Sequence, residues 1–293
     1  MKNSVKRTLG DTVSSAAVWA MMTEASVTPK PGLVDRNNPG SHGDMDFFTL
    51  IHSATALLPW FRDCALAGFN SVDDPAVLFE SLRPPGMTAE DVMKKSTGGI
   101  NTHKGYIFSL GILSAAYGRL YRITRKPALD GVIQFAKEMT VNLRDDFSRS
   151  HKKNEITHGE AVFAHTNIQG IRGEVSLGFP SVIECALPLL RRLLQQGHSL
   201  NDAGVAVLLR LMARVQDTNL IHRGGIEAFR SIQKDLLDFL CIEPDMQAVM
   251  EKAEAMDREF ILKKLSPGGC ADLLGITFFL WKIFDDRSLT EHR

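Results

Sequence analysis

Apolar residues recur along this chain at the spacing of an α-helix. After Met246 they lie three or four positions apart, at Val249, Met250, Ala253, Met256 and Phe260. Residues spaced in this way share one face of a helix. Strict alternation of apolar and polar residues, which is typical of half-buried strands, is not evident in the sequence. The pattern therefore predicts an all-α chain.

Two segments, 107–120 and 205–212, are apolar on nearly every side, and such helices usually lie at the centre of a bundle. Further helices are expected over 11–26, 46–68, 75–82, 88–95, 129–147, 181–196 and 226–241. Neither an internal repeat nor a low-complexity linker divides the chain. We therefore expect a single compact multi-helix catalytic domain over residues 1–293, with central buried helices and Gly-rich functional loops. Its most polar stretch, 148–157, is expected to form an exposed loop or a mobile lid.

Charge balance and cysteine spacing narrow the function classes. The chain has 34 basic and 34 acidic residues, so it lacks the basic excess of a sequence-tolerant nucleic-acid binder. Its 4 cysteines form no Cys-x-x-Cys pair, which favours a reducing, cytoplasmic location over a disulfide framework or zinc site. No run reaches the ~20 apolar residues of a membrane span, since the best candidate, 268–284, carries Asp272 and Lys282. We expect neither nucleic acid nor membrane as a partner.

The loops carry more charge than a helical bundle needs, and function often lies on such loops. The loop 29–46 contains prolines and glycines that forbid a regular helix. Its polar side chains include Lys30, Asp35, Arg36, Ser41, His42, Asp44 and Asp46. The alternative to a binding loop is a solvated turn in which Asp44 or Asp46 caps the next helix.

Residues 97–105 read Thr-Gly-Gly-Ile-Asn-Thr-His-Lys-Gly and lead into the first buried helix. Asn101 or Thr102 fits the N-cap position, and the free N–H groups of a helix start attract anions. His103 and Lys104 would add positive charge there. A P-loop is excluded, because His103 stands where its second glycine belongs and Gly105 where its hydroxyl residue belongs. We interpret the segment as a phosphate cradle; the alternative is an ordinary capped helix with an exposed lysine.

Two later turns combine carboxylates with arginine and glycine. In the Arg-Gly-Glu segment 172–174, the guanidinium suits phosphate oxygens, and Glu174 is a candidate general base or magnesium ligand. In the segment 217–225, Asp217 and its polar neighbours suit a hard cation, and Arg223 precedes glycines that allow close approach of a ligand. The alternatives are a surface charge pair and a helix C-terminal turn.

A final helix start is predicted with Ser266 as N-cap and Pro267 at the first helical position. Gly268 and Gly269 are poor helix formers, so we expect a phosphate or ribose to approach this turn, with Asp272 at the same end. Together these turns indicate a composite site where several helix ends converge. The sequence contains no His-Glu-x-x-His, Gly-x-Gly-x-x-Gly or Gly-x-Ser-x-Gly motif.

These segments, in this order, resemble the triphosphoribosyl-dephospho-CoA synthase family. They are Pro-Lys-Pro-Gly-Leu-Val-Asp ending at Asp35, Ser41-His42, Asn-Thr-His-Lys-Gly ending at Gly105, Arg-Gly-Glu, Asp-Thr-Asn, Arg-Gly-Gly and Leu-Ser-Pro-Gly-Gly-Cys-Ala-Asp-Leu-Leu. The resemblance runs from Glu24 to Leu280, essentially the whole chain. One departure is Cys270, where we would expect serine.

The resemblance implies a transferase that moves the 5-triphosphoribosyl group of ATP to the ribose 2′-hydroxyl of 3′-dephospho-CoA and releases adenine. The product would be the prosthetic-group precursor for the acyl carrier subunit of citrate lyase; a similar enzyme serves malonate decarboxylase. The resemblance also implies ATP and 3′-dephospho-CoA as substrates, Mg²⁺ as cofactor and a downstream holo-acyl-carrier-protein transferase as partner. It is compatible with a homo-oligomer. By analogy with glycosyl transfer, the transition state would be oxocarbenium-like.

On this hypothesis, Glu174 is the first choice for general base and Asp35 the second. Asp217 would hold magnesium, with Glu24, Asp44 or Asp272. The phosphates and other substrate groups would be held by Lys30, Arg36, Ser41, His42, Asn101, Thr102, His103, Lys104, Arg172, Arg223, Ser266, Gly268 and Gly269.

Two other function classes stay open at this point. A magnesium-dependent helical nucleotide or ADP-ribose hydrolase would also need clustered aspartates and phosphate-binding loops. A non-catalytic helical scaffold would have no need of so many glycine-rich, charged turns.

Overall fold

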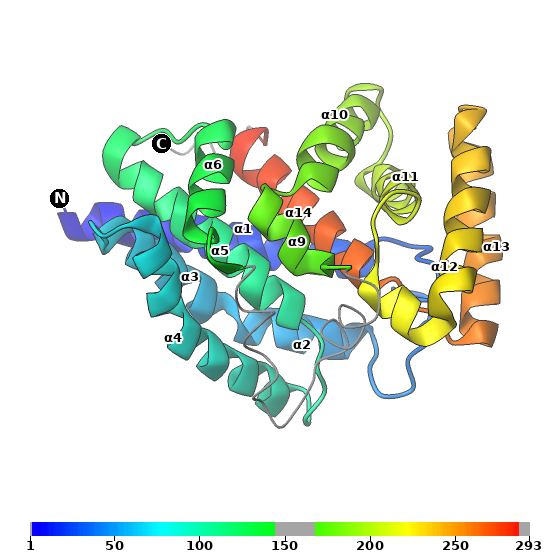
Figure 1. Cartoon of the computed structure of the whole chain (residues 1–293), viewed down its shortest axis with the longest axis horizontal. Helices are drawn as coiled ribbons and strands as arrows, with labels where there is room; N and C mark the ends of the chain where they lie inside the picture. The colour runs from blue at the N-terminus through cyan, green and yellow to red at the C-terminus, as the bar shows by residue number, and fades with distance from the viewer. Residues whose placement is uncertain (1, 144–167, 287–293) are drawn as a thin grey trace.

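The computed structural model describes residues 2–143 and 168–286, and within these ranges every regular element is a helix (Figure 1). The all-α prediction is confirmed. The helices are α1 (Lys2–Ser26), α2 (Phe47–Ala56), α3 (Leu58–Asn70), α4 (Pro75–Ser96), α5 (Lys104–Thr124), α6 (Leu129–Met139), α9 (Gly170–Leu177), the π-helix η2 (Ser181–Ala186), α10 (Leu187–Gln195), α11 (Leu200–Met212), α12 (Thr218–Cys241), α13 (Met246–Lys263) and α14 (Gly268–Phe284). The polar stretch 148–157 lies outside the described residues.

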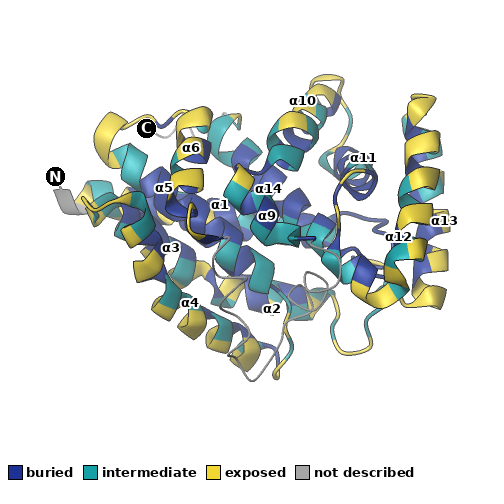
Figure 2. Cartoon of the chain, in the orientation of Figure 1, coloured by how far each residue is buried: buried dark blue, intermediate teal, exposed yellow. Residues whose placement is uncertain are grey.

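The segments predicted to be central are the buried ones. In α5 every residue from Ser109 to Gly118 is buried, and in α11 the only residue between Ala203 and Met212 that is not buried is Arg210. In α14, every residue from Leu273 to Leu280 is buried. Figure 2 shows these helices largely dark blue, whereas α4 and α13 carry exposed residues along their outer faces.

The helices α3 and α5 pack with their backbones almost in contact. A Cβ added at Gly68 would lie 1.9 Å from the Ala115 carbonyl oxygen, and one added at Gly118 would lie 2.0 Å from that of Ala65. Only glycine fits either position, since real Cβ atoms do not approach so closely. Helix α1 packs against both α3 and α14. Helices α12 and α13 lie together at one end of the molecule (Figure 1).

Several predicted helix boundaries were wrong. The segment 46–68 forms two helices, α2 and α3, because Leu57 is the C-cap of the first and Pro59 lies in the first turn of the second. Conversely, the two helices predicted around Pro84 and Pro85 are one, α4. Both prolines are exposed, so water can satisfy the carbonyl groups that they leave without an N–H donor. In the predicted segment 129–147, the helix α6 ends at Met139, and residues 144–147 lie outside the described part of the chain.

The later half of the chain brought two further corrections. The segment 217–225 does not end a helix but begins α12, which continues past a break at Gly225 (φ 78°) into the helix predicted over 226–241. The helix α9 was not predicted at all.

Two predicted N-caps were also wrong. The cap of α5 is His103, without a side-chain capping bond, and the hydroxyl of Thr102 bonds Ser53 instead. The cap of α14 is Pro267, because the hydroxyl of Ser266 is taken by a histidine ring. The alternative for the first loop was right at one residue: Asp46 caps α2.

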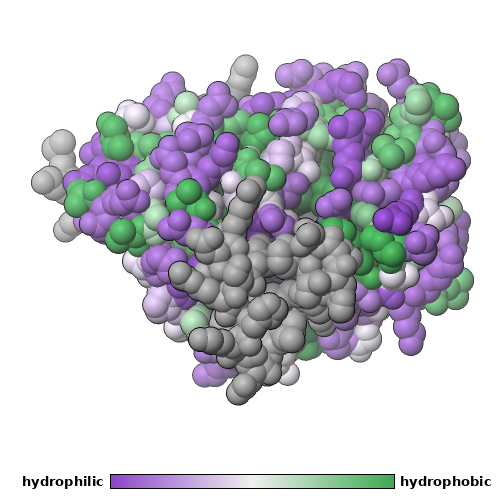
Figure 3. Space-filling model, in the orientation of Figure 1, coloured by the Kyte–Doolittle hydropathy of each residue, from purple (hydrophilic) through white to green (hydrophobic). Residues whose placement is uncertain are grey.

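No single helix in the described ranges is long and apolar enough to cross a membrane; only the bent pair Gly170–Leu177 and Ser181–Gln195 meets the length and composition required. On the face drawn in Figure 3, hydrophilic residues are interspersed with small hydrophobic patches.

Candidate active site

The loop between α1 and α2 folds back onto the end of α13. The Gly32 N–H donates to Asp257 Oδ1 at 2.9 Å, and the Ser41 hydroxyl donates to the carbonyl oxygen of Leu265 at 2.5 Å. Asp35 organises the turn, since its carboxylate accepts the N–H groups of Lys30, Asn37 and Asn38. This folding turns the first residues of the loop towards the protein interior.

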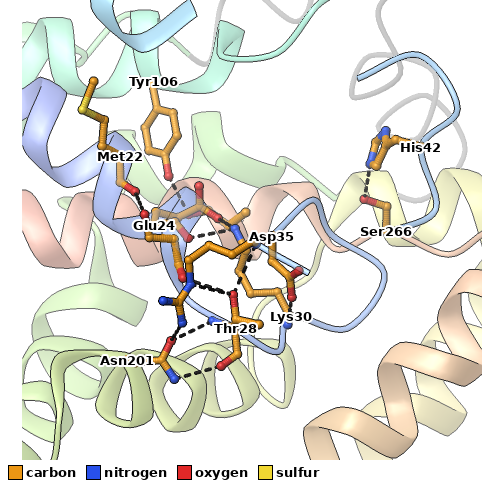
Figure 4. Close-up of polar contacts among 12 residues, drawn as sticks. Met22, Glu24, Thr28, Lys30, Asp35, His42, Tyr106, Asn201 and Ser266 are labelled. Atoms are coloured by element: carbon orange, nitrogen blue, oxygen red, sulfur yellow. Dashed lines mark hydrogen bonds and ion pairs between the residues drawn. The ribbon is translucent and has the colours of Figure 1, made fainter. Parts of the chain in front are cut away.

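A buried ion pair results. Lys30 Nζ lies 2.5 Å from Glu24 Oε1 and 2.8 Å from the Glu24 carbonyl oxygen, and the two residues are 1% and 3% exposed. Burial raises the pKa of Glu24, and the nearby ammonium of Lys30 opposes that rise. Figure 4 shows Tyr106 above this pair, with its ring pointing towards Glu24. The ammonium of Lys30, predicted to bind phosphate, is directed at Glu24 in this structure.

The start of α5 contributes a neutral histidine. His103 Nδ1 lies 2.7 Å from Ser53 Oγ, which in turn lies 2.6 Å from Thr102 Oγ1. Burial, and secondarily the charge of Lys30, lowers the pKa of His103 to about 3. The ring is therefore uncharged at neutral pH, and its buried Nε2 has no hydrogen-bond partner among the described residues. A neutral ring cannot supply the positive charge that the sequence led us to expect here.

Asp272, near the start of α14, lies against the first turn of α5. A Cβ at Gly105 would be 1.9 Å from Asp272 Oδ2, so the glycine makes room for this carboxylate. The pKa of Asp272 is raised well above its usual range by burial and by the charges of Glu24 and Asp217. We call Glu24, Asp217 and Asp272 the inner acidic cluster. The sequence pointed to all three residues as magnesium ligands, and the fold brings them into electrostatic contact.

Asp217 serves two helices at once. Its Oδ1 accepts the N–H groups of Asn219 and Leu220 at 2.9 and 3.0 Å, which caps α12. Its Oδ2 accepts the Cys270 N–H at 2.8 Å, in the first turn of α14. Burial nevertheless raises its pKa above the ordinary value. A carboxylate thus already occupies the position where these two helix N-termini would attract an anion.

The glycines at the start of α14 are explained by this contact. A Cβ at Gly268 would lie 2.7 Å from the Asn219 side chain, and one at Gly269 would lie 3.1 Å from Asp217 Oδ2. The groups that approach these glycines are therefore protein atoms of the α12 start. Close approach was predicted correctly, but in this structure its partner is not a ligand.

A cavity of about 40 Å³ opens beside the inner acidic cluster. Its walls come from the start of α9, the turn before α12 and the start of α14, and they include Gly170, Ile171, Asp217, Thr218, Gly269 and Asp272. The volume suits one or two water molecules or an ion rather than a nucleotide.

Glu174 lies one turn along α9 from Ile171, and so on the same side of that helix as the cavity wall. Its Oε1 accepts the Ser181 hydroxyl at 2.6 Å and its Oε2 the Ser181 N–H at 3.1 Å. Burial raises its pKa, and the two bonds from Ser181 oppose the rise. Its charge also contributes to the raised pKa of the Cys270 thiol, which places Glu174 within electrostatic range of the α14 start.

Most of the cationic side chains that were predicted to bind phosphate lie away from the inner acidic cluster. Arg36 is exposed and bonds Thr28 Oγ1 at 3.3 Å and Asn201 Oδ1 at 3.2 Å. Lys104 forms an ion pair with Glu90 at 2.9 Å. We call Arg36, Lys104, Arg172 and Arg223 the outer cations, because all four are exposed or half-buried.

A second polar group surrounds His42. Its Nε2 lies 3.0 Å from Ser266 Oγ, and Arg223 donates to the carbonyl oxygens of Ser41 and Lys264 at 3.2 and 3.3 Å. Figure 4 shows the His42–Ser266 pair well apart from Glu24 and Lys30. Burial and Arg223 lower the pKa of His42, with Asp44 opposing at 3.9 Å.

Sequence reasoning did not single out Tyr106, Ser53 or Ser181, although all of them touch residues that it did. The Tyr106 hydroxyl donates to the Ala271 carbonyl oxygen at 2.8 Å and lies within hydrogen-bonding reach of Glu24. A lone tyrosine or serine in an apolar helix gives no sequence signal of such contacts. Asn101, which was singled out, is exposed at the loop before α5.

A magnesium ion would find carboxylates here but no finished site. In the described part of the chain, no three His, Cys, Asp or Glu side chains are arranged to hold a metal. Mg²⁺ commonly uses only one or two protein carboxylates and takes its other ligands from water and substrate phosphates. No described residue donates a hydrogen bond to Asp272, so its carboxylate fits that role best; Asp44 is exposed on the loop beside His42.

Comparison with known proteins gives a consistent result. A family model described as ATP:dephospho-CoA triphosphoribosyl transferase matches residues 10–290. A probable 2-(5''-triphosphoribosyl)-3'-dephosphocoenzyme-A synthase of Streptococcus equi subsp. equi is 39% identical over 285 residues, which cover 92% of this chain and 95% of the relative. A protein of the same name from Streptococcus pyogenes serotype M3 is 38% identical over 280 residues, covering 91% and 95%. No solved structure is significantly similar to the chain.

Proposed function

The chain belongs to the ATP:dephospho-CoA triphosphoribosyl transferase family, and we propose that it moves the 5-triphosphoribosyl group of ATP to the ribose 2′-hydroxyl of 3′-dephospho-CoA, releasing adenine. The bond from the anomeric carbon to the adenine nitrogen breaks, and a bond to the 2′-oxygen forms. One proton leaves the hydroxyl and one is taken up by adenine. The triphosphate stays intact, so the site must bind it without cleaving it.

The observation that supports this chemistry best is the inner acidic cluster. Glycosyl transfer develops positive charge at the anomeric carbon, in an oxocarbenium-like transition state. Fixed negative charge in a site shielded from water stabilises such a transition state. In their ionised forms, Glu24, Asp217 and Asp272 would supply that charge next to the cavity, with Lys30 compensating only Glu24 directly.

We propose that the outer cations bind the triphosphate. Arg36, Lys104, Arg172 and Arg223 are accessible, and guanidinium groups suit phosphate oxygens. Neighbouring groups that would assist them by hydrogen bonding are Ser41, His42, Asn101, Thr102 and Ser266. In this arrangement Lys30 and His103 belong to the floor of the site, where one neutralises Glu24 and the other offers an uncharged ring nitrogen.

Glu174 is the proposed general base for the 2′-hydroxyl. It is only half-buried, and among residues 2–143 and 168–286 its carboxylate accepts hydrogen bonds from Ser181 alone. Asp35, the second choice, is 2% exposed and already accepts three backbone N–H groups, which leaves it little freedom to receive a proton. Positioning of the reactants would supply about 7–11 kcal/mol of barrier reduction, and the base a further factor of about 10²–10⁴.

Asp272, together with Glu24 or Asp217, would hold Mg²⁺, and Asp44 is the alternative near His42. Bound Mg²⁺ would neutralise phosphate charge. The raised pKa of Asp272 has the sign expected of a carboxylate that lacks a compensating cation.

The whole chain is proposed to act as one catalytic domain in the cytoplasm. The four free cysteines fit a reducing compartment. The proposed product would pass to a holo-acyl-carrier-protein transferase, in the citrate lyase or the malonate decarboxylase pathway. A homo-oligomer is compatible with this role.

The direct test is to incubate the protein with ATP and Mg²⁺, with and without 3′-dephospho-CoA, and to separate the products by chromatography. Adenine released only when 3′-dephospho-CoA is present is the expected result. Adenine or phosphate released without it would instead identify a hydrolase. A scaffold would release neither, and ATP would not raise its melting temperature, although a ligand at ~100 times its Kd should add ~2.7 kcal/mol of stability.

The base is tested by Glu174→Gln. We expect turnover to fall by about 10²–10⁴-fold while ATP binding, followed by calorimetry, is retained. Near-normal turnover would remove Glu174 from the mechanism and leave the proposed reaction untouched.

A further inference from the structure

The chain makes an unusual corner just after Glu174. The axes of α9 and of the following helical stretch, Ser181–Gln195, differ by 77°. Between them, Gly178 and Phe179 both have left-handed backbones, with φ of 82° and 57°. A left-handed conformation costs a bulky residue about 1–3 kcal/mol, and it persists only where its surroundings impose it.

Phe179 is held in this conformation by full burial and by its own backbone. Its side chain is 0% exposed, and its N–H donates to the Glu174 carbonyl oxygen at 2.6 Å. The carbonyl oxygen of Phe179 then accepts the N–H groups of Val182 and Ile183 at 3.0 and 2.9 Å. The strained residue therefore ties the end of α9 to the start of the next helix.

That next helix starts as a π-helix, η2, and its first residue is Ser181. Short π-helical turns are rare, and those that occur are often found at functional sites. Here the corner returns Ser181 to Glu174, so that its hydroxyl and its N–H donate to the two different carboxylate oxygens, at 2.6 and 3.1 Å. One residue thus fixes both the position and the rotation of the carboxylate.

We infer that Ser181 is a positioning residue for the Glu174 carboxylate, and that the Gly178–Phe179 corner exists to present it. The inference rests on the proposed role of Glu174 as general base. In the part of the chain that the structure describes, Ser181 is the residue that hydrogen-bonds this carboxylate. Near Glu174, Glu184 of η2 contributes repulsion, the Cys270 thiol of α14 carries no charge, and the Lys137 side chain of α6 packs at Gly178.

A general base works only when its lone pair is directed at the proton that it removes, so a carboxylate free to rotate loses rate rather than substrate affinity. Ser181→Ala removes the hydroxyl bond and keeps the N–H bond. We expect kcat to fall roughly ten- to hundredfold, the equivalent of one hydrogen bond to a charged group, with KM for both substrates unchanged. Ser181→Thr retains a hydroxyl and should restore most of the rate.

Ser176→Ala is the matched control. Ser176 also lies on α9, is also half-buried and also donates a hydrogen bond, to the Gly173 carbonyl oxygen at 3.0 Å, but it does not touch Glu174. This variant should keep the kcat of the unmodified protein.

The decisive experiment is a double-mutant cycle on adenine release with 3′-dephospho-CoA present, combining Ser181→Ala with Glu174→Gln. If Ser181 acts only through Glu174, its substitution has no further effect on the residual kcat of Glu174→Gln. The inference would be overturned if the two losses of kcat multiplied in the double variant, or if kcat were unchanged in Ser181→Ala alone. An equal loss of kcat in Ser176→Ala would also overturn it. Failure of the proposed reaction would be distinguishable, because the unmodified protein would then release no adenine in response to 3′-dephospho-CoA.

Discussion

Where α3 crosses α5, the buried groups are glycine and alanine, and the two backbones touch. At the start of the same helix α5, Glu24 and a neutral His103 are buried, and Asp272 is half-buried. In the first region, the close packing of α3 against α5 stabilises the fold. The second brings like charges together, and the raised pKa values of its carboxylates show that the fold works against their ionised forms.

This contrast between the two regions indicates which buried groups are retained for activity and which for stability. Sites commonly retain groups that lower stability because activity needs them. Close packing requires the glycines of the α3–α5 contact, whereas the inner acidic cluster has a chemical reason to be acidic if it stabilises a positive transition state. Substitutions in the two regions should therefore differ in their effects on stability and activity.

The largest effect on stability is expected from Lys30→Met. It leaves Glu24 buried without a partner, which costs about 3–5 kcal/mol for a broken buried ion pair. Glu24 can take up a proton in response, so the loss should shrink as the pH falls. Denaturant unfolding at several pH values measures this. The double variant with Glu24→Gln is the control and should recover most of the loss; no recovery would show that packing of the lysine chain, not charge, is responsible.

A smaller loss is expected from Gly118→Ala in the α3–α5 contact. The added methyl would lie 2.0 Å from the Ala65 carbonyl oxygen, and overpacking of this kind costs about 1–3 kcal/mol as the helices move apart. Unlike the previous loss, this one should not depend on pH, because no titratable group is involved. Gly131→Ala, where the nearest atom is a leucine methyl at 3.3 Å, is the control. An unchanged midpoint of unfolding in Gly118→Ala would contradict the close packing.

The smallest effect is expected from Lys104→Ala, which removes one of the outer cations. Its side chain is 43% exposed and is shared with Glu90, so we expect ATP binding to weaken by about tenfold or less, with 3′-dephospho-CoA binding nearly unchanged. Calorimetric titration with each substrate measures both. Lys126→Ala, an exposed lysine just beyond the C-terminal end of α5, should change neither. Equal weakening for both substrates, or for neither, would remove Lys104 from the triphosphate site.

The sequence was sufficient for the elements whose pattern is local. Apolar spacing located α5, α11 and α13, and Asp46 was one of two candidates for the cap of α2. It failed where the outcome depends on distant parts of the chain. Ser266 is a good N-cap by type, but its hydroxyl is engaged by His42, which is more than two hundred positions away.

The site was predictable as a set of residues but not as an arrangement. Glu24, Asp217 and Asp272 were all singled out, yet only the fold shows that they share one cluster and that Lys30 is directed at it. Gly268 and Gly269 were correctly expected to allow close approach, but whether a ligand or Asp217 approaches cannot be read from glycine itself. Ser181 was missed because its partner Glu174 lies across a corner that no periodicity predicts.

If the inner acidic cluster is kept for chemistry at a cost in stability, Asp272→Asn should stabilise the fold and impair the reaction. The raised pKa means that folded Asp272 binds its proton more tightly than the unfolded chain does, so its contribution to stability falls as the pH rises through the folded pKa. The amide removes that loss. Thermal unfolding and adenine release should therefore be measured on the same preparation, with unfolding followed without Mg²⁺ or nucleotide. We expect a higher melting temperature than that of the unmodified protein at neutral pH, a difference that disappears in acid, and a large loss of turnover. A lower melting temperature at neutral pH, or turnover that is retained, would contradict this expectation.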